Sequence, residues 1–245
     1  LIMNLSNIDS KNHINFLSGL SLFENIQAVE IESMLPQLKI KKYQKGEIFS
    51  FDINNRPRLY LTFIGQFKLT KINERGDEMI LRVVNAGEVI SPMHFSHYYD
   101  VSAEFIKDTT LLYFSESTVN SFVKKSPQFA KNIINMLAES IQALMVTAEV
   151  WRLKNTKERL GWFLASVNNN NLGKLPIAKS ILASYLGMTP ESLSRALKKL
   201  SDEGIELENN TIVQKTGYEL CSYCDKVIGS DCNVFGSHDC PLFNS

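Results

Sequence analysis

The sequence predicts an α+β protein in which an N-terminal β-barrel of the jelly-roll type, one long helix and a C-terminal winged helix-turn-helix follow one another. Three observations predict this order: short strands separated by turn residues, then apolar residues at heptad spacing, then small and turn residues at helix-turn-helix spacing. The barrel, the long helix, the helix-turn-helix and a cysteine-rich tail are expected over residues 1–125, 126–155, 156–217 and 218–245.

The first part, from about Leu20 to Phe114, has the pattern of short strands. Turn residues at Lys45-Gly46, Ile64-Gly65 and Glu74–Asp77 separate apolar runs. Such regular spacing favours a barrel or sandwich over alternating strands and helices. The expected strands are 41–43, 47–51, 58–63, 66–71, 79–84 and 110–114.

A long helix is expected from Ser126 to Asn155. Ser126 is suited to cap it and Pro127 to begin it. Thirty helical residues would span about 45 Å, more than one small domain needs. Its apolar residues, here called the heptad stripe, recur at spacings of three and four: Ile134, Leu137, Ile141, Leu144, Ala148 and Trp151. Pairing with a second copy in a parallel coiled coil is the simplest way to bury the stripe, and packing against the barrel is the alternative.

The stretch KSILASYLGMTPESLSRALK, beginning at Lys179, predicts a helix-turn-helix. Ala183 is the small residue where two crossing helices touch, Gly187 forms the turn, and Thr189-Pro190 caps and begins the second helix. The alternative is two ordinary helices that match by chance. After Gly204, the Asn209-Asn210 turn between short apolar runs predicts a β-hairpin wing.

The second helix of this motif is expected to enter the major groove of double-stranded DNA. Arg195 can hold guanine O6 and N7, Glu191 can accept from cytosine N4, and Ser194 can contact a base edge or a thymine methyl group. Lysines are better suited to phosphate. The expected DNA-binding residues are Thr189, Glu191, Ser192, Ser194, Arg195, Lys198 and Lys199.

Composition limits the remaining possibilities. Lys plus Arg and Asp plus Glu both number 26, which argues against a general polyanion binder, but basic residues gather between Trp151 and Lys199. A solvated helical face is the alternative interpretation of that charge. We find no signal peptide and no stretch that approaches the roughly 20 apolar residues of a membrane span, so a cytoplasmic protein without a membrane partner is expected. No nucleophile motif, phosphate loop or carboxylate pair indicates an enzyme.

The order of parts resembles the Crp/Fnr regulators over about Leu20 to Val213. LYLTFIGQFKLTKINERGDEMILRVVNAGEVI is similar to the family's cyclic-nucleotide-binding-like barrel, and LGMTPESLSRALKKLSDEGI to its helix-turn-helix. Glu191, Ser194 and Arg195 match the Glu-x-x-Ser-Arg pattern of the Fnr and Dnr branches. The resemblance implies a homodimeric transcription regulator that reads an inverted repeat of TTGAT-like half-sites and works with RNA polymerase.

The barrel departs from the cyclic AMP binders of this family. Ser91-Pro92 stands where the pattern has Gly-Glu, and Val101 replaces the arginine that holds the phosphate. Without that guanidinium a buried cyclic phosphate would lack its main charge partner, so cyclic AMP is not expected as a ligand. His94 and His97 could ligate haem, with exposed loop histidines as the alternative.

All four cysteines, Cys221, Cys224, Cys232 and Cys240, lie in the last 25 residues and are interpreted as one metal site. In a cytoplasmic protein clustered thiolates bind metal more often than they form disulfides. The C-x₂-C-x₇-C-x₇-C spacing and the Cys240-Pro241 pair are compatible with an iron–sulfur cluster, as in the Fnr branch, although that branch normally places its cysteines at the N-terminus. Zinc, redox-active thiols and idle thiols are the alternatives, and His238 could replace one cysteine.

Two hypotheses for the regulator therefore remain. In the first, an iron–sulfur cluster on the tail senses oxygen, nitric oxide or redox state and its integrity favours DNA binding. In the second, the tail holds a structural zinc ion and the barrel senses a small molecule or haem.

Overall fold

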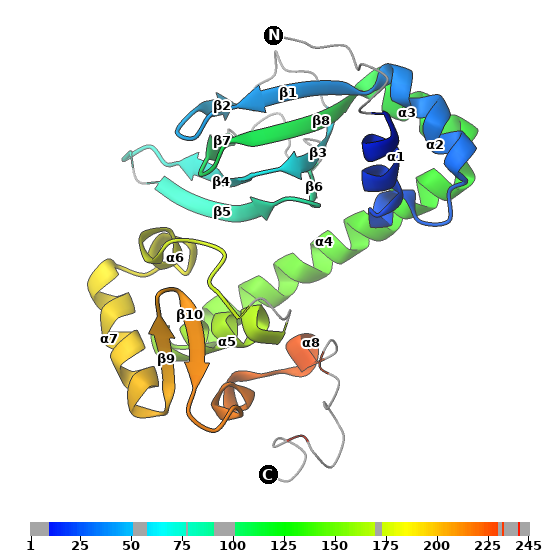
Figure 1. The fold of residues 1–245 in the computed structure, drawn as a ribbon. Coiled ribbons are helices and arrows are strands. Elements are labelled where there is room, and N and C mark those ends of the chain that lie inside the picture. The colour runs from blue at the N-terminus through cyan, green and yellow to red at the C-terminus, as the bar shows by residue number, and fades with distance from the viewer. Residues whose placement is uncertain are drawn as a thin grey trace. The chain divides into compact units, whose positions relative to one another are not determined.

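The computed structural model describes residues 10–50, 58–76, 78–90, 101–169, 173–229, 232 and 240. The chain divides into two compact units, Leu1–Ile141 and Gln142–Ser245, which are described separately (Figure 1).

The first unit is built around two four-stranded antiparallel sheets. One sheet has the strand order β1-β8-β3-β6 and the other β2-β7-β4-β5, which is the sandwich-like arrangement of a jelly roll. The strands are β1 Lys39–Tyr43, β2 Ile48–Ser50, β3 Arg58–Ile64, β4 Gln66–Ile72, β5 Glu78–Asn85, β6 Val89–Ile90, β7 Ser102–Phe105 and β8 Thr109–Ser115.

Two apolar cores lie on opposite faces of the first sheet, because neighbouring residues of a strand point to opposite sides. In β8, Leu111 and Tyr113 belong to the core between the sheets, where the rings of Tyr43 and Phe105 stack with centroids 4.0 Å apart. Leu112 and Phe114 belong to the second core, which helices cover. Those helices are α1 Ser10–Ser18, η1 Ser21–Phe23, α2 Ala28–Met34, η2 Leu35–Gln37, α3 Glu116–Lys125 and the start of α4 Pro127–Leu153.

Three features of the first unit differ from the expectation. The helical elements η1, α2 and η2 lie between Ser21 and Gln37, although the strand-rich part was expected to begin at about Leu20. The helix α3 and the strands β6 and β7 had no predicted counterpart. Strand β6 has only two residues at the edge of its sheet, and β7 has four residues between β2 and β4, so pairing with neighbouring strands decides their structure.

The long helix expected over 126–155 is α4, and it begins as the sequence predicts. The amide of Phe129 donates to Ser126 Oγ at 3.4 Å, and Pro127 is the first helical residue. In the first unit, Asn132 ties α4 down by donating from Nδ2 to the carbonyls of Leu22 and Glu24, each at 2.9 Å.

The expectation that no stretch is apolar enough to cross a membrane is wrong for α4. By length and composition alone this helix passes that test, and almost none of its most apolar stretch is buried within the chain. The reason is that Ala, Met and Val fill the positions between the heptad residues. One such helix is weak evidence for a membrane span, and the regular spacing favours helix pairing instead.

The second unit contains the end of α4 and a small domain of three helices and a hairpin. These elements are α5 Thr156–Asn169, α6 Lys179–Tyr185, α7 Pro190–Asp202, β9 Ile205–Glu208 and β10 Thr211–Gln214. They pack on a core formed by Leu160, Leu164, Leu182 and Leu200, all of which are fully buried. The tail adds the 3₁₀ turn η4 Glu219–Tyr223 and the short helix α8 Lys226–Gly229.

Candidate nucleic-acid interface and cysteine segment

Helices α6 and α7 meet at a tight turn of the predicted composition. Gly187 has a φ of +62°, a left-handed conformation that glycine adopts without strain. The amide of Met188 donates to the carbonyl of Ala183 at 2.8 Å, and Ala183 is buried where the two helices come together. The turn thus sets α7 at the angle that a helix-turn-helix requires.

Thr189 and Pro190 begin α7 as the sequence predicts. Thr189 Oγ1 accepts a hydrogen bond from the amide of Ser192 at 3.2 Å, which satisfies one of the free amides of the first turn. The apolar side of α7 is formed by Leu193, Ala196 and Leu200, all buried.

The opposite side of α7 is exposed and carries the expected DNA-binding side chains. Glu191, Ser194, Arg195, Lys198 and Lys199 are exposed, and Ser192 is half-buried. Arg195 Nη2 donates to Ser192 Oγ at 3.3 Å. Hydrogen bonds from its own amide and from Thr189, together with the charge of Arg195, hold the pKa of the Glu191 carboxyl below its usual value. Glu191 is therefore an ionised acceptor at neutral pH.

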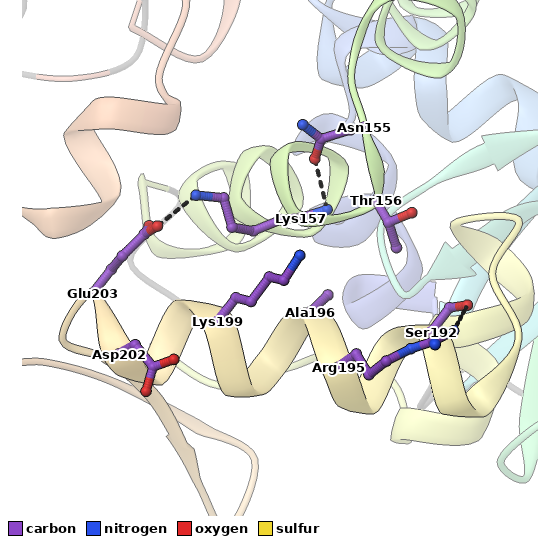
Figure 2. A pocket seen from close by; sticks show the side chains of 9 residues that line it. All are labelled: Asn155, Thr156, Lys157, Ser192, Arg195, Ala196, Lys199, Asp202 and Glu203. Atoms are coloured by element: carbon purple, nitrogen blue, oxygen red, sulfur yellow. Dashed lines mark hydrogen bonds and ion pairs between the residues drawn. The ribbon is translucent and has the colours of Figure 1, made fainter.

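A groove of about 610 Å³ runs between the start of α5 and α7 (Figure 2). Its cationic side chains are Lys157, Arg195 and Lys199, and Asp202 and Glu203 make its end at the C-terminus of α7 acidic. Of these cations only Arg195 lies in the N-terminal half of α7, while Lys199 lies in the C-terminal half and Lys157 pairs with Glu203. The N-terminal half is the one that a helix-turn-helix presents to DNA.

The start of α5 borders the groove and was not among the expected site residues. Asn155 Oδ1 accepts from the amides of Lys157 at 3.0 Å and Glu158 at 3.1 Å, while Glu158 Oε2 accepts from the Asn155 amide at 2.8 Å. This reciprocal arrangement is a capping box, and the Asn-x-x-Glu pattern in the sequence could have revealed it. Lys157 Nζ donates to Glu203 Oε1 at 2.5 Å across the groove (Figure 2).

The predicted wing is the β9–β10 hairpin. Its register pairs Glu208 with Thr211, and the two residues between them, Asn209 and Asn210, have φ values of 49° and 65°. Two consecutive positive φ angles are those of a type I′ turn, which asparagine tolerates well.

The four cysteines are free thiols, and Cys240 is buried. Burial, followed by repulsion from Cys240 and Cys232, raises the pKa of Cys221. Burial and the neighbouring Asp225, Cys221 and Cys232 raise the pKa of Cys224 to about 11. Cys232 thus acts on both Cys221 and Cys224, and Cys240 acts on Cys221. Within the residues described, no three His, Cys, Asp or Glu side chains are close enough to bind one metal ion.

The heptad stripe of α4 is largely exposed. The exposed fractions are 65% for Ile134, 59% for Ile141 and 69% for Leu144, with 40% for Trp151. Ala148 is exposed and Leu137 half-buried. Side chains of this size are costly to leave in water, so the stripe is suited to an apolar partner.

Of the other candidate sensor residues, the structure describes Val101 alone. Val101, which stands where cyclic AMP binders have their arginine, is fully buried in the core between the sheets. His94, His97 and Ser91-Pro92 lie outside the described residues, as does His238.

Comparison with known proteins identifies the type of the small domain in the second unit. Residues 158–216 match the model of the Crp-like helix-turn-helix domain. The chain is 23% identical to the cyclic AMP receptor protein of Thermus thermophilus over 77% of this chain and 89% of that protein. It is 22% identical to the fumarate and nitrate reduction regulatory protein of Escherichia coli K12, over 73% and 78%. Residues 158–216 are therefore a Crp-like helix-turn-helix domain.

A solved structure shares the fold of this chain. FixK2 from Bradyrhizobium japonicum superimposes with a TM-score of 0.66 at 21% identity, covering 77% of this chain and 98% of that one. The likeness confirms the predicted fold of jelly roll, long helix and helix-turn-helix. The cysteine segment lies beyond the matched helix-turn-helix residues.

Proposed function

We propose that this Crp/Fnr-type DNA-binding regulator acts as a homodimer in the cytoplasm and reads an inverted repeat of TTGAT-like half-sites. The observation that carries the proposal is the exposed side of α7, where Glu191, Ser194 and Arg195 all face solvent and Arg195 also lines the groove. In this proposal Arg195 holds guanine O6 and N7, Glu191 accepts from cytosine N4, and Ser194 contacts thymine or a base edge.

The remaining polar side chains of α7 are assigned to the DNA backbone. Lys198 and Lys199 are exposed, and an ammonium group is better suited to a phosphate than to the edge of a base, so we assign both to phosphates. Pairing of two chains through the heptad stripe would place two α7 helices at half-sites about one helical turn, or 34 Å, apart. The exposed apolar side chains of the stripe support this pairing.

The DNA site is tested by gel shift with a duplex that carries two inverted TTGAT half-sites. We expect Arg195→Ala to lose about 1–3 kcal/mol of binding free energy and to discriminate less at the guanine position. Lys198→Ala is the matched control, because loss of a phosphate contact weakens binding to all sequences alike and lowers the salt slope by about 1. Unchanged affinity of the Arg195→Ala protein for the repeat would refute the assignment of α7.

We further propose that Cys221, Cys224, Cys232 and Cys240 hold an iron–sulfur cluster. The support is the residue type, because sulfur donors suit the soft-metal chemistry of such a cluster. Metal binding would have to bring the four thiols closer together and displace the protons that the raised pKa values favour at Cys221 and Cys224. When bound, the cluster would supply sensitivity to oxygen and nitric oxide. The protein would contribute the thiolates and the partly buried surroundings of the site.

Zinc on the same four cysteines is the competing assignment, and metal content decides between them. Protein purified without oxygen is analysed for iron, sulfide and zinc and by absorption spectroscopy. Brown protein that bleaches in air with loss of DNA binding is expected. Colourless protein with one zinc per chain would refute the cluster and leave the signal to a ligand of the barrel.

A further inference from the structure

The aromatic ring of Tyr223 packs directly against helix α5. In the sequence, Tyr223 stands between two of the tail cysteines. Only 8% of Tyr223 is exposed. A Cβ atom on Gly161 would lie 2.2 Å from Tyr223 Cδ1, so the ring rests on bare backbone at that position. Because Cys221 and Cys224 are two residues before and one residue after Tyr223, a rearrangement of either cysteine has to act on this ring.

The hydroxyl of Tyr223 reaches the end of α7. It donates to Glu203 Oε2, and Glu203 is the C-cap residue of α7. The other oxygen of the same carboxylate accepts from Lys157 Nζ at 2.5 Å, and that ammonium lies 5.7 Å from the centroid of the Tyr223 ring. Tyr223, Glu203 and Lys157 therefore form a closed cluster that joins the tail, the end of α7 and the start of α5.

Two further contacts fasten the same segment. Trp162 Nε1 donates to Asp225 Oδ2 at 2.7 Å, and the amide of Ile228 donates to Asp225 Oδ1 at 2.9 Å. The amide of Leu220 donates to Gln214 Oε1 of β10 at 2.8 Å, and the Leu220 side chain is buried. The cysteine segment is thus packed into the helix-turn-helix domain on both sides of Tyr223.

Two members of the cluster also line the groove between α5 and α7. Lys157 and Glu203 form part of the wall that Arg195 and Lys199 complete (Figure 2). The carboxylate of Glu203 sets where the Lys157 ammonium lies, and Tyr223 sets where that carboxylate lies. Displacement of Tyr223 would release both charges and loosen the contact between the start of α5 and the end of α7.

We propose that Tyr223 is a positioning residue through which the state of Cys221 and Cys224 controls the DNA affinity of α7. The proposal rests on the proposed DNA-binding function but not on the identity of the metal. While the cysteine segment is held in place, Tyr223 holds the Glu203 carboxylate where it pairs with Lys157, and the groove between α5 and α7 keeps its shape. When the segment is displaced, the Tyr223 ring moves away from Gly161. The Glu203–Lys157 pair that lines the groove is then no longer held in position.

The test compares two states of the full-length protein and measures affinity for the inverted repeat in each. In one state the thiols are as isolated without oxygen. In the other they are released from any metal with a chelator and alkylated with iodoacetamide. We expect alkylation to weaken binding of the wild type between about 5-fold and 150-fold. In Tyr223→Phe, which keeps the ring and loses the hydroxyl, the ratio should fall to within about twofold of unity.

The matched control is Tyr218→Phe, because Tyr218 is 59% exposed and belongs to the same segment. This variant should keep the wild-type ratio, with the same number of alkylated thiols by mass spectrometry. A Tyr223→Phe protein that keeps the full wild-type ratio would overturn the proposal. Glu203→Gln is a second variant that keeps an acceptor for Tyr223 and removes the charge that holds Lys157, so it should weaken the coupling as well.

Hydrogen exchange without DNA separates this inference from the proposed function. Alkylation should speed exchange of the amides in the first turn of α5 and the last turn of α7 in the wild type. In Tyr223→Phe these amides should exchange fast in both states. If exchange responds in this way but neither state binds the repeat, the coupling stands and the proposed DNA site is wrong. Unaltered exchange of the wild type on alkylation would overturn the coupling itself.

Discussion

The ring of Tyr223 occupies the space that a side chain at Gly161 would need. The two residues are 62 positions apart in the sequence, yet a Cβ on Gly161 would come within 2.6 Å of three ring atoms. Gly161 lies inside α5, where alanine would ordinarily be about 1 kcal/mol better. The glycine therefore weakens its own helix and makes room for the tail.

Gly161→Ala is expected to displace Tyr223 and with it the hydrogen bond to Glu203. Forcing a methyl group into a packed contact should lower the free energy of unfolding by about 1–3 kcal/mol, measured by urea denaturation. The matched background is Tyr223→Ala, in which the space is open and the alanine should stabilise α5 instead. An equal cost of Gly161→Ala in both backgrounds would contradict the contact.

The difference between what the sequence predicted and what it did not follows from the range of the interactions. The turn at Gly187 and the cap at Thr189 are made by residues close in sequence, so a few consecutive residues are enough to predict them. Helices α1 and α2 were not predicted because Leu17 and Ile31 gain their burial from a sheet formed much later in the chain. The position of the Tyr223 ring depends on contacts with both α5 and α7, which are distant in sequence, so no local pattern predicts it.

The same distinction applies to the cysteines. Their clustering in the sequence predicted one metal site, and metal binding stays a prediction, because within the described residues no three His, Cys, Asp or Glu side chains are close enough to hold an ion. A metal site depends on distances among the thiols that the spacing does not set. What the structure adds is the hydrogen bond between Asp225 and Trp162, which fastens the segment to α5.

Thr189→Ala should destabilise α7 at its first turn. The alanine removes the hydroxyl that accepts from the Ser192 amide, and loss of an N-cap costs about 1 kcal/mol. Thr189→Ser keeps the oxygen and should recover most of that loss in urea denaturation. Affinity for the TTGAT repeat should fall in the alanine variant only, since Ser192 and Arg195 depend on that turn. Equal stability of the alanine and serine variants would show that the cap contributes nothing.

Leu144→Glu should convert the dimer to a monomer. Leu144 is 69% exposed, and a carboxylate at that position would face its own copy across a parallel pair of α4 helices. Sedimentation equilibrium measures the mass, and affinity for the inverted repeat should fall with it. Gln142→Glu adds the same charge to an exposed position on another side of α4 and should leave the dimer intact. A dimeric Leu144→Glu protein would exclude the heptad stripe as the pairing surface.

Lys68 links two strands of the jelly roll through Glu78 at 2.6 Å and Glu104 at 2.9 Å. Burial by itself would lower the pKa of Lys68, but the hydrogen bonds and charges of the two glutamates outweigh it and the pKa is raised. A raised pKa means that the folded protein favours protonated Lys68. The resulting stability is fully present below the pKa of an unfolded lysine, about 10.4, and is lost as pH rises through the higher folded value.

Lys68→Met should therefore lower the free energy of unfolding at pH 7, and this loss should shrink progressively as pH rises above the pKa of an unfolded lysine. The expected loss at pH 7 is about 1 kcal/mol, because both carboxylates are more than one-third exposed and water screens the pairs. Urea denaturation at neutral and alkaline pH measures the difference. The exposed Lys39 of β1 provides the control, since Lys39→Met should change stability little at either pH. A Lys68→Met loss that stayed constant into the alkaline range would show that Lys68 contributes by packing its methylene chain between the strands and not by its charge.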